Sequence, residues 1–438
     1  MKPIVIKILA VLALALACAT SIHAETIKVC PTKTGTGWLE KTASGALVLH
    51  LEGSYYDMGV QQATLLREQT QGATRTLLNT LTKQIPILPA SWSIWLLDRF
   101  VFQKEAPFIP KEYMDEMQGL ADASGIDLRI IHVAHAFAYL ASCETAAAWG
   151  PATNDHNLYF VRSNDDFVPV DPLTKKPYND RMVMVYKPTD EVPYMLVNLP
   201  GLTGASDGMN AEGIAIGNMS LPSKYETPAG IPMQFRIKQV LAKAHTLDQA
   251  VEWMTKEPLE GGYNFIVADS KIPDARAIEM NAKNIYMGAW DGPAESNHYT
   301  FRGKAYSYQP VNGLIMRANH PLSSEILADF KGHIEYKDKN YVTGPRYADL
   351  RARLVKAYGS LTLTTMFDLL RESYLQMDYG DAPTQNASTW QIAFAPKSGD
   401  FLLAISNGDP MIIGRHKASA FSQPYQRYNL LDLLNAKP

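Results

Sequence analysis

Cys143 divides this sequence into two patterns. Before it, after one expected strand over 46–51, apolar residues recur at the helical period, and a first helix should begin at the capping box Ser54-Tyr55-Tyr56-Asp57. From Cys143 onward, short apolar segments alternate with turn residues, as strands do. Runs of helices beside runs of strands predict an α+β fold of packed layers with a mainly helical N-terminal segment.

Two segments before Cys143 are candidates for burial in the core. A buried helix is expected over 128–140, and an aromatic segment covers 92–102. Asp98 and Arg99 interrupt the aromatic segment, which argues against a membrane span. We expect ordinary core packing there; an interfacial helix and the wall of an acyl pocket are the alternatives.

Composition and motifs narrow the functional classes. The 438 residues are 46% hydrophobic, which is enough for a large core. A formal net charge of −3 provides no basic excess for nucleic acid, so a small neutral or apolar substrate fits better. The chain has no H-E-x-x-H, C-x-x-C, Walker or G-x-S-x-G motif. We therefore expect neither a metal nor a cofactor.

Residues 1–24 have the pattern of an export signal. Lys2 and Lys7 precede an apolar stretch over 8–17, and Ile22-His23-Ala24 forms a cleavage site. This pattern predicts a periplasmic or secreted protein. Lipidation at Cys18, with membrane contact through the lipid, is the weaker alternative, because Leu16 stands where a small residue is preferred.

Cleavage of the signal leaves two cysteines, Cys30 and Cys143, and a disulfide between them is one interpretation. The other is an N-terminal nucleophile. Attack of the Cys143 sulfur on the carbonyl of the small residue Ser142 would cut the chain and free an α-amine. With an ordinary pKa of about 7.7–8.0, this amine can accept the proton of its own thiol.

Polar residues downstream could support such a nucleophile. Arg162, Asp165 and Asp166 lie on the next expected strand, where a hairpin would bring them beside Cys143. The amides of Asn210 and Asn264 could donate to an oxyanion. Solvated turns are the alternative interpretation of the segments around Asp165 and Asn210.

Several segments, in this order along the chain, resemble the peptidase C45 family, the relatives of acyl-CoA:6-aminopenicillanic acid acyltransferase. They begin before the first helix and end near the C-terminus. These segments are 53–59, 117–125, Ser142-Cys143-Glu144-Thr145, 162–167, 264–269 with Ile278-Glu279, Ala318-Asn319-His320 and Gly408-Asp409-Pro410.

The resemblance implies a four-layer αββα sandwich, the N-terminal-nucleophile hydrolase fold, and a self-cleaving precursor that acts on amide-linked acyl groups. The implied divisions are a signal (1–24), a helical segment that becomes one chain (25–142) and a catalytic chain (143–438) that stays associated with it.

The resemblance also assigns roles to residues. Cys143 is the nucleophile, Asn264 the oxyanion donor, and Asn164 and Asp166 the support of the free amine. Similarity to bile-salt hydrolases of the wider superfamily adds Arg162 and Asn210. The chain departs from the family pattern in three residues. Ser142 stands where the family has Gly, and Glu144 where it has Thr or Ser. Ser163 is inserted between Arg162 and Asn164.

Three functions follow from these patterns. The first is hydrolysis of an N-acyl amide, with water as the acceptor because acyl-CoA is not expected outside the cytoplasm. The second is hydrolysis of an ester of the lysophospholipid kind, with residues 92–102 holding the acyl chain. The third is a silent envelope binding protein with a Cys30–Cys143 disulfide. Of the histidines, His156 is expected to be solvated, and His320 could be functional or structural.

Overall fold

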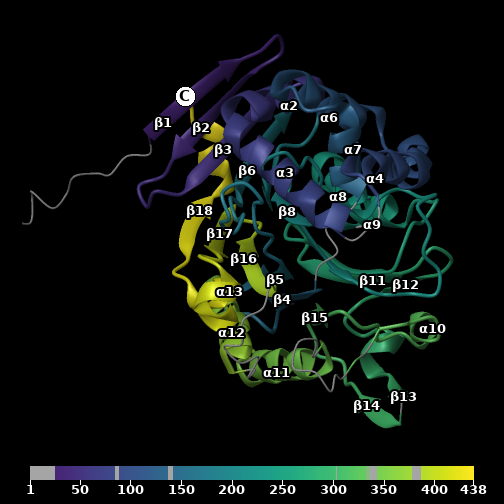
Figure 1. Cartoon of the computed structure of the whole chain (residues 1–438). Helices are drawn as coiled ribbons and strands as arrows, with labels where there is room; N and C mark the ends of the chain where they lie inside the picture. The colour runs from purple at the N-terminus through teal and green to yellow at the C-terminus, as the bar shows by residue number, and fades with distance from the viewer. Residues whose placement is uncertain are drawn as a thin grey trace, which may run out of the picture.

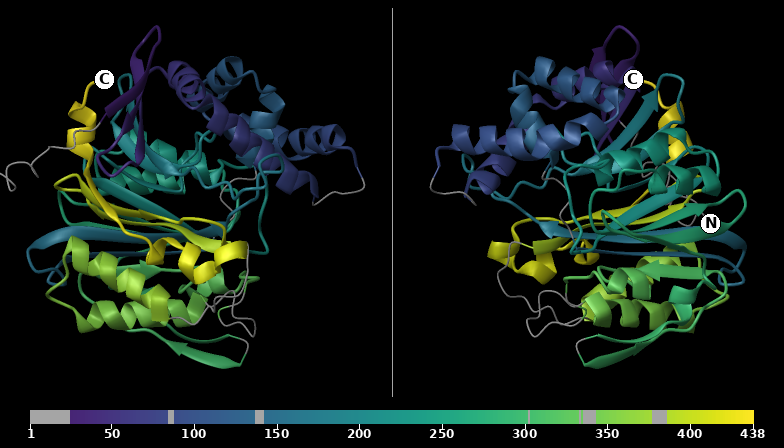
Figure 2. Two further views of the ribbon diagram at one scale, coloured as in Figure 1. Left: turned by 60° about the vertical axis from the view of Figure 1, so that its left-hand side comes forward. Right: turned by 90° about the vertical axis from the view of Figure 1, so that its right-hand side faces the viewer.

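Two β-sheets face each other, and helices cover both outer sides, so the chain forms four layers (Figures 1 and 2). The predicted αββα sandwich is confirmed. Three apolar cores hold the layers together, one between the sheets and one under each helical layer. The computed structural model describes residues 25–83, 88–136, 142–301, 303–332, 334, 343–376 and 386–438.

The larger sheet has ten strands, and its neighbours are antiparallel except for one parallel pair, β3 with β6. Its order is β1 (Glu25–Pro31), β2 (Thr36–Lys41), β3 (Leu47–Gly53), β6 (Met182–Pro188), β7 (Tyr194–Asn198), β8 (Asp207–Asn210), β9 (Ile214–Ser220), β10 (Tyr263–Asp269), β11 (Asp274–Met280) and β12 (Ile285–Gly288).

The smaller sheet has six antiparallel strands, and a separate hairpin joins β13 (His298–Phe301) to β14 (Lys304–Ser307). Side chains alternate across this sheet: Ala147 and Phe160 pack against the ten-stranded sheet, whereas Ala146 and Val161 pack toward helices. The order is β15 (Leu314–Arg317), β4 (Ser142–Gly150), β5 (His156–Phe167), β16 (Asn386–Ala395), β17 (Asp400–Ile405) and β18 (Gln426–Asn429).

Helices cover the ten-stranded sheet on its outer side. The first begins where predicted, because Ser54 Oγ accepts the Asp57 N–H at 3.2 Å. The helices are α2 (Tyr55–Leu65), α3 (Arg67–Lys83), α4 (Ala90–Leu97), η1 (Asp98–Phe102), α5 (Gln103–Glu105), η2 (Ala106–Phe108), α6 (Lys111–Ser124), α7 (Leu128–Ala136), α8 (Met233–Lys243) and α9 (Leu247–Thr255).

The other helical layer lies on the six-stranded sheet, where α11 (Thr343–Lys356) and α12 (Leu363–Gln376) pack their apolar sides on β4, β5 and β16. Short helices complete the chain: η3 (Pro293–Ser296), α10 (Ser324–Leu327), α13 (Pro410–Ile413), α14 (Arg415–Ala418), η4 (Ala420–Ser422) and α15 (Leu430–Asn435).

The packing of α2 on α6 depends on two glycines. A Cβ atom on Gly59 would lie 2.1 Å from the Glu116 carbonyl oxygen, and one on Gly119 would lie 2.1 Å from the Tyr56 carbonyl oxygen. Both distances are far inside van der Waals contact, so any larger residue would force the helices apart. This explains why glycines of the first two family motifs stand at these positions.

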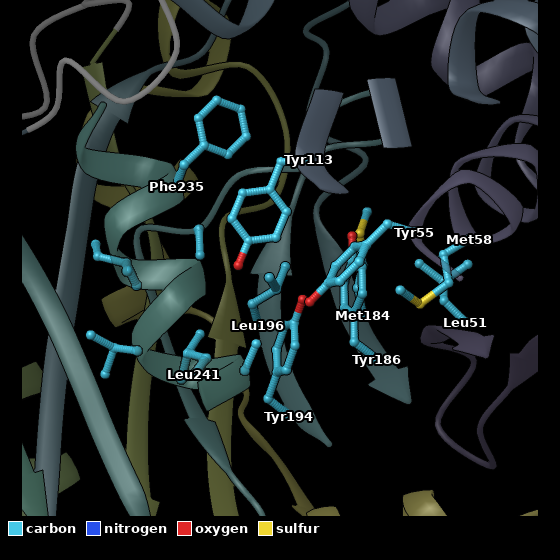
Figure 3. Close-up of a cluster of buried hydrophobic side chains, with 14 of the residues drawn as sticks. Leu51, Tyr55, Met58, Tyr113, Met184, Tyr186, Tyr194, Leu196, Phe235 and Leu241 are labelled. Atoms are coloured by element: carbon cyan, nitrogen blue, oxygen red, sulfur yellow. The ribbon is translucent and has the colours of Figure 1, made fainter. Parts of the chain in front are cut away.

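Beneath these helices, a cluster of buried side chains joins α2, α6 and α8 to the sheet (Figure 3). The ammonium of Lys238 lies 4.6–5.1 Å from the ring centres of Tyr55, Tyr113 and Tyr186 and forms a fully buried ion pair with Glu116. The ion pair therefore joins α6 to α8, and the contact of the ammonium with the Tyr186 ring of β6 joins α8 to the sheet.

The N-terminal segment contains strands as well as helices, and one prediction about it is corrected. Its first strands, β1 to β3, extend the ten-stranded sheet, and β3 pairs with β6, so the segments before and after Cys143 share one sheet. Core packing is wrong for Trp92, Trp95 and Phe100, which are 61%, 45% and 53% exposed, and correct for Phe102.

Other predictions were met in part. The strand over 46–51 is confirmed as β3, and α7 confirms the helix from Leu128 as far as Ala136. Residues 137–140, and the export signal with Cys18, lie outside the described residues. Within the described part of the chain, no helix has the length and apolarity needed to cross a membrane.

Candidate active site

Cys143 is the second residue of β4 and is fully buried between the two sheets, where it contacts Met219 of β9. Opposite it on β5 is Asn164, and the preceding residue, Ser142, is paired with Asp165. The Ser142–Cys143 peptide bond thus lies at the very start of a central strand. The side chains of Cys143, Arg162 and Asn164, which point toward the ten-stranded sheet, form what we call the inner face.

Arg162 is the cation of the inner face. Its Nη2 lies 3.1 Å from Cys143 Sγ, 2.9 Å from Asn164 Oδ1 and 3.0 Å from Asn218 Oδ1. Asp207 balances its charge in a fully buried ion pair. The predicted placement of Arg162 beside the cysteine is confirmed, because Ser163 simply occupies the intervening position that faces the other side of the sheet.

Burial raises the pKa of the Cys143 thiol to about 12, although Arg162 opposes this shift. The thiol is therefore neutral at physiological pH in the uncleaved chain and needs a base. Its S–H donates to Asn164 Oδ1 at 3.6 Å, and the Asn164 amide nitrogen donates to Thr389 Oγ1 at 2.8 Å. Asn164 is an acceptor for the sulfur, so it orients the thiol without deprotonating it.

The backbone of Cys143 is held by residues far along the chain. Its N–H donates to Asn319 Oδ1 at 2.8 Å, and its carbonyl oxygen accepts from Arg346 Nη2 at 2.7 Å. The same Nη2 donates to Asn319 Oδ1 at 2.8 Å. Arg346 comes from α11, and Asn319 follows β15. Together they fix the nitrogen that self-cleavage would turn into the α-amine.

The predicted support of the free amine by Asn164 and Asp166 stays a prediction, because in the uncleaved chain neither of them is bonded to this nitrogen. Asn164 contacts the sulfur, and Asn319 contacts the nitrogen. Asp166 accepts from the N–H of Phe167 at 2.7 Å. Burial raises the pKa of Asp166, and nearby Arg181 opposes the shift.

Asp165 faces away from the thiol, on the side of the sheet covered by α11 and α12. Its carboxylate accepts from Arg346 Nη1 at 2.8 Å, the Tyr374 hydroxyl at 2.8 Å and Ser163 Oγ at 2.9 Å. The side chains of Glu144, Ser163 and Asp165 form what we call the outer face. Arg346, which donates to both, links the Asp165 carboxylate to the Cys143 carbonyl oxygen.

The two predicted oxyanion donors are engaged elsewhere. The Asn264 amide nitrogen donates to the carbonyl oxygens of Ala318 and His320 at 2.8 and 2.9 Å, which uses both of its N–H groups. Asn264 therefore holds the backbone on either side of Asn319. Its donation to an oxyanion would need a different conformation and stays a prediction.

Asn210 is a structural residue of a turn. Its amide nitrogen donates to the carbonyl oxygens of Leu241 and Ala244 at 3.0 and 2.9 Å, and its Oδ1 accepts from the N–H groups of Glu212 and Ile214. The turn interpretation is correct here, and Asn210 is not part of the site.

Sequence patterns missed most of the residues that surround Arg162 and Cys143. Asn218, Asp207, Trp390 and Arg346 come from distant strands and helices, and no short motif connects them to Cys143. Asn319 was visible only as part of the Ala318-Asn319-His320 match. Asn218 accepts from Arg162 through Oδ1, and none of the hydrogen bonds between described residues uses its side-chain amide nitrogen.

The cysteine and histidine alternatives are resolved by geometry. Cys30 is a free, buried thiol in β1, so the predicted Cys30–Cys143 disulfide is wrong. His320 is buried, its Nδ1 is 2.9 Å from Thr343 Oγ1, and burial lowers its pKa to about 3, which is a structural role. His156 is exposed, as predicted, and is the first residue of β5. Within the described ranges, no three His, Cys, Asp or Glu side chains are grouped to hold a metal.

A four-layer αββα sandwich whose central strand begins beside a buried cysteine defines the N-terminal-nucleophile class of fold. Residues 152–339 match the family model of acyl-coenzyme A:6-aminopenicillanic acid acyl-transferase. This match covers less than half of the chain and agrees with the family that the motifs predicted.

Relatives of the chain are distant. A protein of Archaeoglobus fulgidus is 24% identical over 393 residues, which are 81% of this chain and 62% of that protein. Protein dcd1A of Dictyostelium discoideum is 22% identical over 328 residues, 66% of this chain and 71% of its own length. The chain thus spans less than two thirds of the Archaeoglobus protein.

Two solved structures are similar to about two thirds of this chain. The Caenorhabditis elegans ortholog of N-acylethanolamine-hydrolyzing acid amidase has a TM-score of 0.38 and 13% identity, covering 66% of this chain and 99% of its own. Penicillin V acylase from Agrobacterium tumefaciens has a TM-score of 0.40 and 14% identity, covering 65% and 91%.

Proposed function

We propose that this protein hydrolyses N-acyl amides through a thioester on Cys143, which self-cleavage frees as a new N-terminus. One observation carries the proposal: separate buried groups hold the sulfur and the nitrogen of the same residue. Arg162 contacts Sγ, and Asn319 contacts the nitrogen. Among the described residues, no histidine nitrogen contacts Cys143, so its own amine is the base that the geometry favours.

Self-cleavage requires the sulfur to attack the Ser142 carbonyl carbon. The S–C bond forms as the Ser142–Cys143 C–N bond breaks, and the nitrogen takes up the thiol proton. Water then hydrolyses the resulting thioester, releasing the Ser142 carboxylate and the thiol. Asn319 Oδ1 accepts from this nitrogen throughout, so the amine is released in place.

The same atoms then serve the substrate. The neutral amine takes the thiol proton, and the thiolate, stabilised by Arg162, attacks the acyl carbonyl. The ammonium returns the proton to the leaving amine as the amide C–N bond breaks, leaving an acyl thioester. Water, deprotonated by the amine, releases the carboxylic acid and restores the thiol.

Asn218 is the best placed donor for the oxyanion. Arg162 Nη2 lies within 3.1 Å of both Cys143 Sγ and Asn218 Oδ1, so the Asn218 amide is adjacent to the reacting sulfur. Because Oδ1 faces the arginine, the amide nitrogen points elsewhere and has its hydrogen atoms for a substrate oxygen.

Intact mass and activity of the purified protein test this function. We expect two chains, 25–142 and 143–438, in the parent protein and one chain in Cys143→Ala. Cys30→Ala is the matched control, because Cys30 is also a free, buried thiol. Hydrolysis should be faster for an N-acyl amino acid than for the ester with the same acyl group. An active enzyme that stays in one piece would refute self-cleavage, and a preference for the ester would change the substrate class.

We also propose that residues 1–24 direct export to the periplasm or beyond. The basic start, apolar stretch and small-residue cleavage site support this. Cell fractionation and N-terminal sequencing test it, and a mature chain that begins at Cys18 would instead indicate lipidation.

A further inference from the structure

Glu144 directly follows the nucleophile and is an unusual residue for its position. Its side chain is fully buried on the outer face, and no described group donates a hydrogen bond to either carboxylate oxygen. A buried carboxylate without donors is costly when charged. The family pattern has Thr or Ser here, so this carboxyl is a property of this chain.

The nearest cation to Glu144 is already engaged. Arg346 Nε lies 3.6 Å from Glu144 Oε2, too far for a hydrogen bond. The other guanidinium nitrogens of Arg346 bind Asp165 at 2.8 Å, the Cys143 carbonyl oxygen at 2.7 Å and Asn319 Oδ1 at 2.8 Å. One guanidinium therefore lies between two carboxyl groups and also holds the backbone of the nucleophile.

The other titratable groups around this pair come from four elements. Around Glu144 and Arg346 lie Asp165 on β5, Asp349 on α11, which also carries Arg346, Tyr374 on α12, and His320 after β15. Burial raises the pKa of Glu144 to about 8; Arg346 opposes the shift, and Asp165 and Asp349 add to it. His320, with a pKa lowered to about 3, stays neutral through this range.

Ionisation of Glu144 would change where Arg346 sits. A charged Glu144 attracts the guanidinium, and closing the 3.6 Å gap to a charge-assisted bond of ~2.8 Å needs a movement of less than about 1 Å. The same movement would lengthen the bonds of Arg346 to the Cys143 carbonyl and to Asn319. Asn319 would then lose the donor to its Oδ1 that helps orient it toward the Cys143 nitrogen, although Ser220 would still accept from its amide nitrogen at 2.8 Å.

We propose that Glu144 is a positioning residue for the nucleophile: its neutral form leaves Arg346 bound to Cys143 and Asn319, and its charged form withdraws Arg346 and slows the reaction. Glu144 thus limits activity at alkaline pH. This inference rests on the proposed function, because it requires Cys143 to be the acylated group.

The test measures acylation of Cys143 by p-nitrophenyl acetate as a function of pH. This activated ester reports the nucleophile without knowledge of the natural acyl group, and Cys143→Ala protein corrects for background hydrolysis. In the parent protein, the acylation rate should fall above a pH of about 8, by about tenfold one unit higher. In Glu144→Gln this fall should be absent, or should move upward by at least about one unit.

Two further variants make the result decisive. Glu144→Thr also removes the carboxyl with a smaller side chain, so it should show the same loss of the alkaline fall even if the glutamine variant does not fold. Glu105→Gln is the matched control, because Glu105 is also buried and burial raises its pKa to about 8, but it lies in α5. Its profile should match that of the parent.

The outcomes separate the inference from the function on which it rests. If a Cys143-dependent acylation occurs and the Glu144 variants keep the parent profile, or Glu105→Gln shifts it equally, Glu144 merely fills space. If no Cys143-dependent acylation occurs in the correctly folded parent, the proposed function and this inference are both overturned.

Discussion

The inner and outer faces of the β4–β5 pair carry opposite charge arrangements, although neighbouring residues build them. On the inner face, Arg162 pairs with one carboxylate, Asp207. On the outer face, Arg346 lies between two, Glu144 and Asp165. Because successive side chains of a strand point to opposite faces, one step along the chain separates the two arrangements.

This comparison shows that the balance of charge on each face decides which groups titrate. The inner face is balanced, so it can present a stable cation to the sulfur. The outer face has one carboxyl more than its cation can satisfy, so one of them keeps its proton near neutral pH. The sulfur of Cys143 thus lies on the balanced inner face. The backbone of Cys143 is held in position by Arg346, which also binds the carboxylate of the outer face.

The largest expected effect tests whether the inner face is balanced as described. Asp207→Asn removes the only carboxylate that pairs with Arg162 among the described residues and leaves a buried, uncompensated cation. Measured by urea denaturation in a Cys143→Ala background, the free energy of unfolding should fall by about 3–5 kcal/mol. Asp115→Asn, which breaks the exposed pair with Lys111, should cost less than about 1 kcal/mol. If both variants lost the same free energy of unfolding, the buried Arg162–Asp207 pair would matter no more for stability than an exposed ion pair.

The second effect separates two amides that approach the site. Asn218→Ala should lower kcat by about 100- to 1,000-fold with little change in KM, because its amide nitrogen has hydrogen atoms for an oxyanion. Asn264→Ala leaves two backbone carbonyls without a donor, so it should lower stability by about 1–3 kcal/mol. Kinetics and melting curves of both variants show which of the two amides donates to the oxyanion. A large kcat loss confined to Asn264→Ala would restore Asn264 as the oxyanion donor.

The third effect tests the unbalanced outer face through stability. The pKa of Glu144 is raised from 4.5 to about 8, so between these pH values the folded state keeps a proton that the unfolded state releases. The stabilisation is complete below about pH 4.5 and is lost as the pH rises through about 8. Relative to Glu144→Gln, the melting temperature of the parent should therefore decline by a few degrees across this range. A constant difference would mean that Glu144 is already charged in the folded state.

The smallest effect concerns the amine and compares two groups near Cys143. Asn319→Asp places a carboxylate against the freed amine and should move the acid limb of kcat/KM upward by about one unit. Asp166→Asn should move it by less than about half a unit, because Asp166 bonds to the Phe167 N–H. The reverse order of shifts would return Asp166 to the role of amine partner.

Much of the fold was predictable because its signals are local. The capping box at Ser54 and the strand over 46–51 depend on neighbours in sequence, and both were found where expected. The placement of Arg162 beside Cys143 also followed, since one hairpin joins β4 and β5, whereas the Asp165 carboxylate, expected there too, lies on the other side of the sheet. The aromatic segment failed this test, because whether Trp92 faces a core or solvent depends on which elements pack against its helix.

The sequence by itself determined the layered α+β architecture, the resemblance to the acyltransferase family, the position of Cys143 at the start of a strand and the hairpin that brings Arg162 beside it. Periodicity and short motifs are sufficient for these, because they record contacts between residues close in the chain. Only the tertiary structure decided that Asn319 and Arg346 hold the backbone of Cys143, that Asn218 lies beside its sulfur and that Glu144 shares a cation with Asp165. These contacts join residues that are as many as 203 positions apart, and their chemistry depends on burial and on the charges that folding brings together.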